Sequence, residues 1–410
     1  MKAKLAKLLS GNILSQAIPL IALPILARQY TPQDFGFFAL YVAICSIISL
    51  ASAGRYDVAL ISAPKLIHKR YLTSLSVLLI IATTCISGFA VIAALMSGKI
   101  DLLWAYLIVA GIPAVALFNL SNNLLNDKEH YGRITTNLTL RSTLWVVISV
   151  IAYQLPNGLM LAFALSYWIV ALINLQKVYK TGKAYKGNWK KLKAIAKHYK
   201  NFPLFNAPHA LLTSFNLNTP SFLLPLFSQT ALLGAYSQAN KVLVTPWQLI
   251  GNALFKIFYK TTAEKQRLGQ PILPVFRKFF SFYAIALIPI FLIGYFIAEP
   301  FFVLLLGEEW RSAGTIGALL LPWIYARAIG GMLAFVPLIL NLQKPAFYFE
   351  IIYSLALATS LLSGLLMDKA IVGIQLFSGV GTAFVLVQII WYLTAIKRND
   401  QRNNPGNENN

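Results

Sequence analysis

Six charged residues lie inside long apolar stretches of the chain: Arg55, Asp57, Arg141, Lys241, Lys256 and Arg327. Placing Arg or Lys at the centre of a membrane helix costs roughly 2.5–3.5 kcal/mol, so such residues persist where they face water, a partner or a ligand. Asp57 is the acid in this set, which leaves the interior net positive. A wet interior lined by guanidinium and ammonium groups suits an anionic ligand, and phosphate is the obvious candidate.

Arg55 is the candidate whose position in its span is most informative. It lies about nine residues, and so about 13 Å, from the cytoplasmic end of its predicted helix, which makes snorkelling to the head groups difficult. Asp57 is two residues further on and points to another helix face, so it does not obviously neutralise Arg55 within the helix. We therefore predict that Arg55 contacts the ligand.

The other intramembrane residues divide by depth. Arg327 and Lys241 lie near the middle of their spans and are predicted to contact the same ligand. Lys256 and Arg141 lie close enough to the cytoplasmic boundary to snorkel, which favours a structural role. Polar residues on the first helix of each half could bind hydroxyl groups or join neighbouring helices by hydrogen bonds: Asn12, Ser15, Gln16, Asn216 and Asn218.

The elements that carry these residues are predicted to be membrane helices. Of the 410 residues 58% are hydrophobic and 12% are charged, whereas soluble domains are about one quarter charged. Apolar runs of about 18 residues or more are typical of transmembrane helices. We predict an all-α protein with about twelve spans, at 8–28, 37–63, 71–97, 101–125, 135–154, 157–176, 204–228, 231–258, 276–305, 314–340, 346–367 and 370–396.

The distribution of Lys and Arg predicts the orientation of these spans. With the N-terminus in the cytoplasm, 26 of the 35 basic residues fall in cytoplasmic segments and four on the opposite side. Cytoplasmic loops are enriched in this way, so both ends of the chain are predicted to be cytoplasmic. The net charge of +22 then indicates contacts with anionic membrane lipids, and no nucleic-acid partner is expected.

The most basic stretch divides the chain into two halves of six spans. Within it, apolar residues recur at helical spacing while lysines take the other faces: Trp189, Leu192, Ile195 and Tyr199. This pattern favours an amphipathic helix at the membrane surface, although a solvated linker that only enforces orientation would carry similar charges. The predicted domains are an N-terminal bundle (1–176), a basic amphipathic linker (177–203), a C-terminal bundle (204–396) and a disordered cytoplasmic tail (397–410).

A short repeat marks the first helix of each half. Pro19 to Pro24 reads PLIALP and Pro220 to Pro225 reads PSFLLP, so both have the form Pro-x-x-x-Leu-Pro. Each proline removes a backbone donor and bends its helix. Interrupted helices at matching places indicate a transport site, and we predict that these prolines are hinges of the gate helices in a parallel repeat. The alternative is that prolines are simply common in membrane helices.

Catalytic signatures are missing from the sequence. It contains neither a GxxxxGKS phosphate loop nor HExxH, and Cys45 and Cys85 lack the spacing of a metal site. The predicted external loops are all short, which disfavours a membrane glycosyltransferase or polymerase. We therefore expect no enzyme activity, no metal and no bound cofactor. The basic, apolar N-terminus resembles a signal peptide but contains two prolines, and we interpret it as an uncleaved first helix.

Five segments resemble a known family: ARQYTPQDFGFFALY, GRYDVALISAP, HYKNFPLFNAP, LLGAYSQANKVLVTP and LLLGEEWRSAG. They are similar to the O-antigen and capsule flippases (Wzx-type) of the multidrug/oligosaccharidyl-lipid/polysaccharide exporter (MOP) superfamily. The resemblance implies two six-helix bundles around a cationic cavity. The implied cargo is an oligosaccharide on undecaprenyl diphosphate, moved to the outer leaflet of a bacterial inner membrane by alternating access, for O-antigen (lipopolysaccharide), capsule or exopolysaccharide assembly.

The resemblance also implies roles for individual residues. Arg55 falls in the basic motif of the second span and would contact the diphosphate, and Asp57 would couple transport to a proton or sodium gradient. Polysaccharide polymerase and chain-length machinery are the implied protein partners. Alternatives are a multidrug antiporter of the same superfamily, whose cationic cargo predicts acids instead of cations, and a peptidoglycan-precursor flippase, which typically has more helices.

Overall fold

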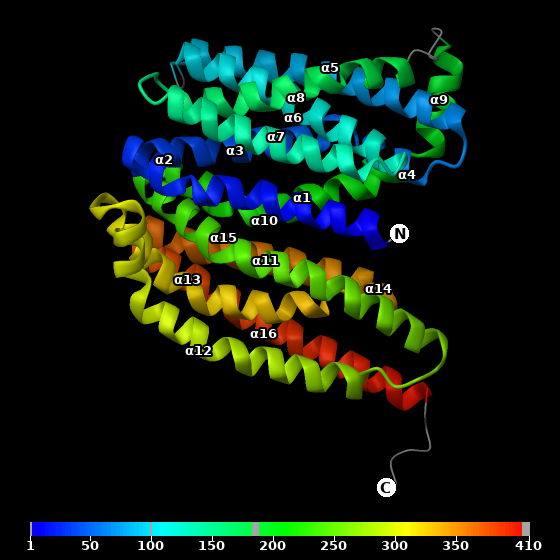
Figure 1. The fold of residues 1–410 in the computed structure, drawn as a ribbon, viewed down its shortest axis with the longest axis vertical. Helices are drawn as coiled ribbons and strands as arrows, with labels where there is room; N and C mark the ends of the chain where they lie inside the picture. The colour runs from blue at the N-terminus through cyan, green and yellow to red at the C-terminus, as the bar shows by residue number, and fades with distance from the viewer. Residues whose placement is uncertain (1, 99–100, 183–187, 404–410) are drawn as a thin grey trace, which may run out of the picture. The chain divides into compact units, whose positions relative to one another are not determined.

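The chain folds into two compact helical units, residues 1–218 and 219–410. The computed structural model describes residues 2–98, 101–182 and 188–403, and helices account for nearly all of these (Figure 1). The boundary between the two units lies inside the helix Ala207–Leu226, whereas the sequence analysis placed it at the basic segment 177–203. Each unit is described separately below.

Unit 1 is built around two buried helices. Leu102–Asp127 (α6) packs against α3, α4, α5, α7 and α8, and Gly158–Gly182 (α8) packs beside it, while the outer helix α5 leaves most of its surface exposed. The remaining elements are α1 (Lys2–Ile21), α2 (Leu23–Gln29), α3 (Pro32–Ser52), α4 (Tyr56–Ser62), α5 (Leu66–Met96), α7 (Tyr131–Ile151), α9 (Trp189–His198), the π-helix η1 (Phe202–Asn206) and the first part of α10 (Ala207–Leu226).

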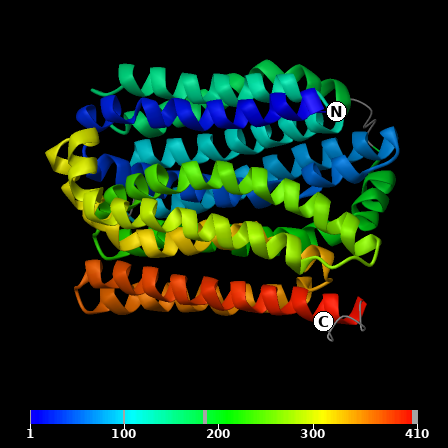
Figure 2. The ribbon, with the colours of Figure 1, turned by 60° about the horizontal axis from the view of Figure 1, so that its bottom comes forward.

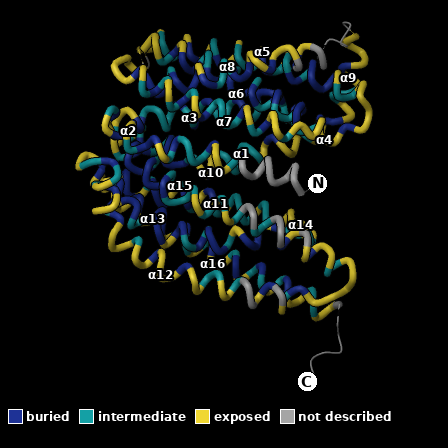
Figure 3. Tube along the Cα trace, in the orientation of Figure 1, coloured by how far each residue is buried: buried dark blue, intermediate teal, exposed yellow. Residues whose placement is uncertain are grey.

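Unit 2 is built around a single central helix, α13 (Arg311–Gly330). Figure 3 shows α13 largely buried and α12 largely exposed. In the most apolar part of Glu308–Ile339, which contains α13, 61% of the residues are buried, whereas in that of Phe280–Leu306 on α12 the share is 11%. α11, α12 and α16 all pack against α13. The elements are α11 (Thr230–Arg267), α12 (Leu273–Leu306), the 3₁₀ turns η2 (Glu308–Trp310) and η3 (Gly331–Leu333), α14 (Val336–Ile339), α15 (Gln343–Leu366) and α16 (Ala370–Asn403).

The helices confirm the all-α prediction, and each of the twelve predicted spans coincides with one or two of them. Among the described residues, ten helical stretches are long and apolar enough to cross a membrane. The two others, α10 and α11, have 20 and 38 residues and are long enough as well, but polar residues such as Asn216, Asn218 and Lys241 lower their apolar character. The protein is therefore a multi-pass membrane protein.

Three spans that we predicted as single helices are interrupted. The span 8–28 breaks at Ala22, the span 37–63 breaks between Ser52 and Tyr56, and the span 314–340 breaks after Gly330. Hydropathy averaged over a span does not detect such breaks, because the apolar residues on either side keep the average high.

The proline repeat does not produce matching breaks. α1 ends at Ile21, between Pro19 and Pro24, whereas α10 continues through Pro220 and Pro225 to Leu226. A proline removes one helix hydrogen bond but does not always end the helix. The hinge roles of these four prolines remain a prediction.

The amphipathic helix α9 packs its apolar face on the protein. Leu192 is buried, and the Tyr56 hydroxyl of α4 donates to the Ala196 carbonyl at 3.2 Å. The Tyr199 hydroxyl lies 3.1 Å from Nδ1 of His68 on α5, and burial raises the pKa of the Tyr199 phenol. Trp189 remains 59% exposed. The apolar face therefore covers α4 and α5.

The start of the tail is helical, which corrects the prediction of disorder from residue 397. α16 extends to Asn403, and residues 404–410 lie outside the described residues. The carboxylate of Asp400 accepts the backbone N–H groups of Ile272 and Leu273 at 2.8 and 2.7 Å, so it caps α12. Gln266 and Asn399 exchange two amide hydrogen bonds. The end of α16 thus fastens the turn between α11 and α12.

Two glycines set the close approach of α15 and α16, which run side by side (Figure 2). A Cβ atom on Gly364 would overlap the backbone of Gly373. We expect Gly364→Leu to destabilise unit 2 by about 1–3 kcal/mol, because the two backbones must separate. Gly379→Leu on α16 is the matched control, since its Cβ would meet open space. Thermal unfolding of the purified proteins measures the difference, and equal melting temperatures would contradict the prediction.

Candidate functional site

The backbone of unit 1 is broken at Arg55, one of the predicted ligand contacts. α3 ends at Ser52 and α4 begins at Tyr56, with Gly54 at φ 56° and Arg55 at φ 59°. The left-handed conformation costs a residue with a side chain roughly 1–2 kcal/mol. Strain of this kind collects at functional sites, and non-helical backbone at membrane depth is tolerated where protein or a cavity surrounds it. The straight-helix depth estimated for Arg55 therefore does not apply.

The break directs the Arg55 side chain toward the start of the seventh span. Its Nε donates to Oδ1 of Asn206 at 2.9 Å, and Asn206 is the last residue of the π-helix η1. Single π-turns of this kind are frequent at functional sites. Within the described ranges, the two terminal amino groups of Arg55 make no hydrogen bond to the protein. These groups could form a two-point contact with a phosphate or carboxylate.

Asp57 is engaged in a different direction. It is 7% exposed, and Oδ2 accepts from Nδ2 of Asn123 on α6 at 2.9 Å, whereas Oδ1 is buried with no partner among the described residues. No ion pair joins Asp57 to Arg55 in the described part of the chain, although the two groups attract each other at longer range. Arg55 is thus not neutralised by direct contact with this acid. The ion-coupling role of Asp57 remains a prediction.

A chain of asparagines crosses the same bundle, and the sequence analysis did not detect it. Nδ2 of Asn137 (α7) donates to Oδ1 of Asn122 (α6) at 2.8 Å, and Nδ2 of Asn174 (α8) donates to Oδ1 of Asn137 at 3.1 Å. Asn137 and Asn174 are buried, so their amides need these partners. The chain ties three helices together beside the Asp57–Asn123 pair, because Asn122 and Asn123 are adjacent. The sequence could have indicated this chain, because three asparagines lie inside predicted apolar spans.

The predicted polar residues of the first and seventh spans lie apart from these contacts. Asn12 and Gln16 are half-buried on α1, which packs against α7. Asn216 is buried on α10, and Nδ2 of Asn218 donates to the Ser214 carbonyl one turn earlier in the same helix, at 2.7 Å. A role in binding hydroxyl groups stays a prediction for all four.

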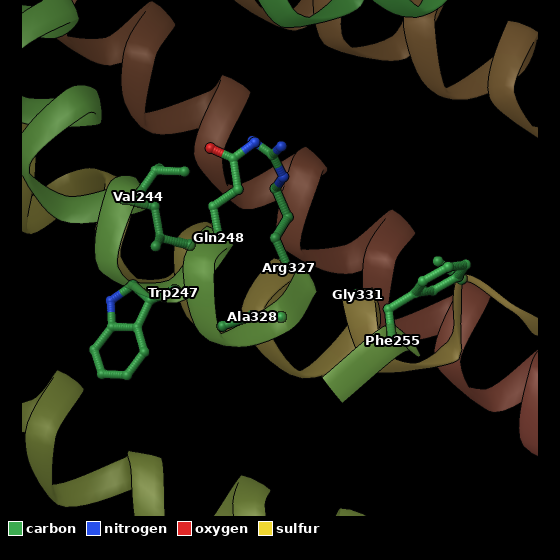
Figure 4. Close-up of a pocket in the computed structure, with 10 residues that line it drawn as sticks. Val244, Trp247, Gln248, Phe255, Arg327, Ala328 and Gly331 are labelled. Carbon is green, nitrogen blue, oxygen red and sulfur yellow. The ribbon is translucent and has the colours of Figure 1, made fainter. Parts of the chain in front are cut away.

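Arg327 lines a cavity of about 390 Å³ inside unit 2 (Figure 4). The guanidinium carbon lies 4.7 Å from the ring centroid of Trp323, a cation–π contact, and Nε1 of Trp323 donates to the Tyr353 hydroxyl at 2.9 Å. Among the described residues, the guanidinium has neither a hydrogen bond nor an ion pair. It is therefore held in place by stacking, with its donors left available to a ligand. The cavity is lined by Val244, Trp247, Gln248, Gly251, Phe255, Ile324, Arg327, Ala328, Gly331 and Ala334.

Gln248 is a polar residue of the cavity that the sequence did not indicate. Figure 4 shows the side chains of Gln248 and Arg327 extending in the same direction in this view, while Trp247 points away from them. Lys241 precedes Gln248 by seven residues, or about two helical turns, and so lies on nearly the same face of α11. Thr245, between them, donates to the Lys241 carbonyl at 2.6 Å. The sequence analysis did not single out Gln248, because the uncharged polar residues that it selected were those on the first helix of each half.

Among the described side chains, the other charged residues inside the predicted spans lie outside the two sites described above. Arg141 stacks at 5.0 Å over the ring of Tyr167 and donates to its hydroxyl at 3.3 Å. The side chain of Lys256 lies outside the described residues. Glu350, within the predicted span 346–367, was missed as a second acid; both it and Arg327 interact electrostatically with Tyr353. Among the described residues, no cluster of His, Cys, Asp or Glu could hold a metal ion.

Comparison with known proteins gives a family and a fold. A family profile described as "Polysaccharide biosynthesis protein" matches residues 25–314. The lipid II flippase MurJ, in an inward closed conformation, superposes with a TM-score of 0.72 at 12% identity, covering 98% of this chain and 91% of MurJ.

The fold is also that of multidrug transporters. An inward-facing multidrug resistance MATE transporter of the MOP superfamily gives a TM-score of 0.71 at 13% identity, covering 93% of this chain and 96% of that one. The Vibrio cholerae MATE transporter VcmN, as a point mutant, gives 0.59 at 13% identity, with coverages of 97% and 96%. None of the curated proteins compared with the sequence matches it.

Proposed function

The chain belongs to the polysaccharide biosynthesis protein family, and on this basis we propose that it is a lipid-linked oligosaccharide flippase. It moves undecaprenyl-diphosphate-linked repeat units from the cytoplasmic to the outer leaflet of a bacterial inner membrane by alternating access. The product feeds O-antigen, capsule or exopolysaccharide assembly. The protein acts as a transporter and not as an enzyme.

The observation that carries this proposal is the membrane-embedded guanidinium of Arg327, which lines a cavity and has no acidic partner within the described residues. A cation in such a place costs free energy unless a ligand or water compensates it. The diphosphate of a lipid carrier is an anion that needs compensation in a low dielectric. Arg327 and the amide of Gln248 together offer donors to its oxygens.

Unit 1 offers a second cationic contact. The terminal amino groups of Arg55 are not used by the described residues, and Asn206 fixes the inner part of the side chain. A guanidinium with two parallel donors is suited to a phosphate. In the proposed mechanism, cationic side chains compensate the charge of the diphosphate, and the lipid chain stays in an apolar environment during transfer.

The multidrug antiporter remains the second candidate, because the MATE fold matches almost the whole chain and Asp57 is a buried acid with one oxygen unpartnered. A cationic drug requires an accessible carboxylate, whereas the accessible charges found at the two sites are Arg55 and Arg327. The flippase therefore explains more of the described side chains.

The test is the lipid-linked oligosaccharide pool in a strain that lacks this gene. We expect completed undecaprenyl-diphosphate repeat units to accumulate on the cytoplasmic face of the inner membrane, because only their transfer is blocked. Protease-protected vesicles of known orientation, probed with a sugar-specific lectin, report the face. Accumulation on the outer face would place the block after transfer and would overturn the proposal in favour of a polymerase or transferase.

A further inference from the structure

An apolar groove of about 230 Å³ lies between α12 and α13 of unit 2, next to the Arg327 cavity. Its floor is formed by Phe291 and Leu321, which are buried, while Ile288, Leu292 and Tyr295 form an exposed rim. Every lining residue is aliphatic, aromatic or proline. Apart from the hydroxyls of Tyr295 and Tyr325, the groove is therefore apolar and carries no charged group.

Aromatic rings form the boundary between the groove and the cavity. Trp247 lines the cavity, and its ring lies 4.9 Å from that of Phe291, which lines the groove. Phe291 in turn lies 5.4 Å from Tyr325, whose hydroxyl donates to the Ala284 carbonyl of α12 at 3.1 Å. Figure 4 shows Trp247 pointing away from the polar ends of Gln248 and Arg327. One side of this aromatic boundary is thus cationic and the other is largely apolar.

Side chains, and not closely packed backbones, close this boundary. Among the described residues, α11 and α12 each pack closely against α13 but make little backbone contact with each other. The Trp247–Phe291 ring pair bridges that gap. Side chains can change rotamer without disturbing the helix hydrogen bonds, so the boundary can open while both helices stay intact.

We propose that the α12–α13 groove holds the isoprene units next to the diphosphate of the lipid carrier, while Arg327 and Gln248 hold the diphosphate itself. The inference rests on the proposed function and assigns this part of the same substrate to one place. Charge complementarity favours this occupant over a bulk phospholipid, because a diphosphate carries more negative charge than a single phosphate and the adjoining cavity presents a guanidinium with no ion pair among the described residues. Each isoprene unit carries a methyl branch that can pack against the aromatic floor.

The groove acts by position more than by affinity. Lipid tails are as apolar as the groove, so moving a chain from the bilayer into it gains little hydrophobic free energy. Binding in the groove must therefore depend on the diphosphate contact at Arg327. This dependence separates the isoprenoid carrier from bilayer lipids, which would fill the groove whether or not Arg327 is present.

The experiment is photolabelling of the full-length protein in phosphatidylglycerol-containing nanodiscs with a diazirine-bearing polyprenyl diphosphate. We expect the label on residues 288–295 and 321–325, and expect undecaprenyl diphosphate but not added phosphatidylglycerol to compete. Arg327→Gln should lower labelling of the groove about tenfold, because it removes one charge-assisted contact. Labelling that persists in Arg327→Gln, or that phosphatidylglycerol displaces, would show an ordinary bilayer-lipid groove and overturn the inference.

A groove-filling variant provides an independent test. A Cβ atom on Gly294 would lie at an ordinary contact distance of 3.5 Å from Leu321, so Gly294→Phe places a ring beside the groove without backbone conflict. Gly379→Phe, with open space around its Cβ, is the matched control. We expect only Gly294→Phe to lose the label. Equal labelling of the two variants would contradict the groove assignment. The labelling assay measures binding of a carrier without sugar, so its outcome is independent of the proposed function. If the groove is labelled but deletion of the gene leaves the lipid-linked oligosaccharide pool unchanged, the flippase proposal is wrong and the groove assignment stands.

Discussion

Replacing Arg55 with glycine is expected to slow polysaccharide export roughly 10- to 100-fold while leaving the folded protein about as stable as the parent. Arg55 adopts φ 59°, a conformation that costs a side-chain-bearing residue roughly 1–2 kcal/mol and that glycine adopts freely. The substitution also removes the charge-assisted hydrogen bond to Asn206, which contributes about 1.5–3 kcal/mol. The two effects on the free energy of unfolding oppose each other, so the net loss of stability is only about 1 kcal/mol.

The slower export follows from loss of the guanidinium. Hydrogen bonds to charged groups contribute about 1.5–3 kcal/mol each, so removing even one from the diphosphate slows transport roughly 10- to 100-fold. Arg55→Glu is expected to be more severe, since it adds repulsion. Surface polysaccharide in a complemented deletion strain measures export, and the melting temperature of the purified protein measures stability.

Two further variants test whether export needs the paired donors of the Arg55 guanidinium. Arg55→Lys keeps the charge but loses the paired donors, so partial export is expected. Arg141→Gln is the control for a membrane arginine that stacks on Tyr167 and lies outside the proposed sites, and it should export normally. Normal export by an inserted Arg55→Glu protein would remove Arg55 from the mechanism.

Arg327→Gln is expected to weaken binding of undecaprenyl diphosphate by roughly 10- to 100-fold, for the same energetic reason. The guanidinium lines the cavity and makes no hydrogen bond or ion pair with described residues, so its loss leaves few partners unsatisfied. Folding should therefore change little. Titration of the purified protein with undecaprenyl diphosphate in nanodiscs, followed by tryptophan fluorescence, reports binding because Trp247 and Trp323 lie at the cavity.

The matched control removes an equal charge elsewhere in unit 2. Lys344→Gln neutralises an exposed lysine near the start of α15 and is expected to leave the binding constant within about twofold, as is usual for a screened surface charge. Arg327→Lys keeps the charge but loses stacking of the planar guanidinium on Trp323, so intermediate binding is expected. If Lys344→Gln and Arg327→Gln weakened binding equally, general electrostatic attraction would replace the specific contact.

The sequence predicted which segments are helical but not where those helices break. The positions of the spans follow from apolar length, and the breaks do not, because Gly54 and Arg55 are consistent with an unbroken helix on hydropathy alone. The docking of α9 was also missed, since amphipathic spacing does not say whether membrane or protein covers the apolar face.

The candidate sites were predicted in part for a related reason. Arg327 and Arg55 were found because a charge inside a span is costly and therefore conspicuous. Gln248 and Asn206, at the same two sites, are uncharged, and the aromatic boundary formed by Trp247 and Phe291 looks like ordinary membrane composition. Only their arrangement in space distinguishes them.

The cap that Asp400 places on α12 also has a consequence for the order of biosynthesis. Asp400 follows Ile272 by 128 residues, so α12 is made and inserted well before its capping carboxylate exists. During that interval the N–H groups of Ile272 and Leu273 can be satisfied by water at the membrane surface. Unit 2 can therefore complete the contacts of its α11–α12 turn only after translation has passed α16. A ribosome that stalls before residue 400 would leave a chain with every span made but the α11–α12 turn unfastened, a state that quality-control proteases could recognise.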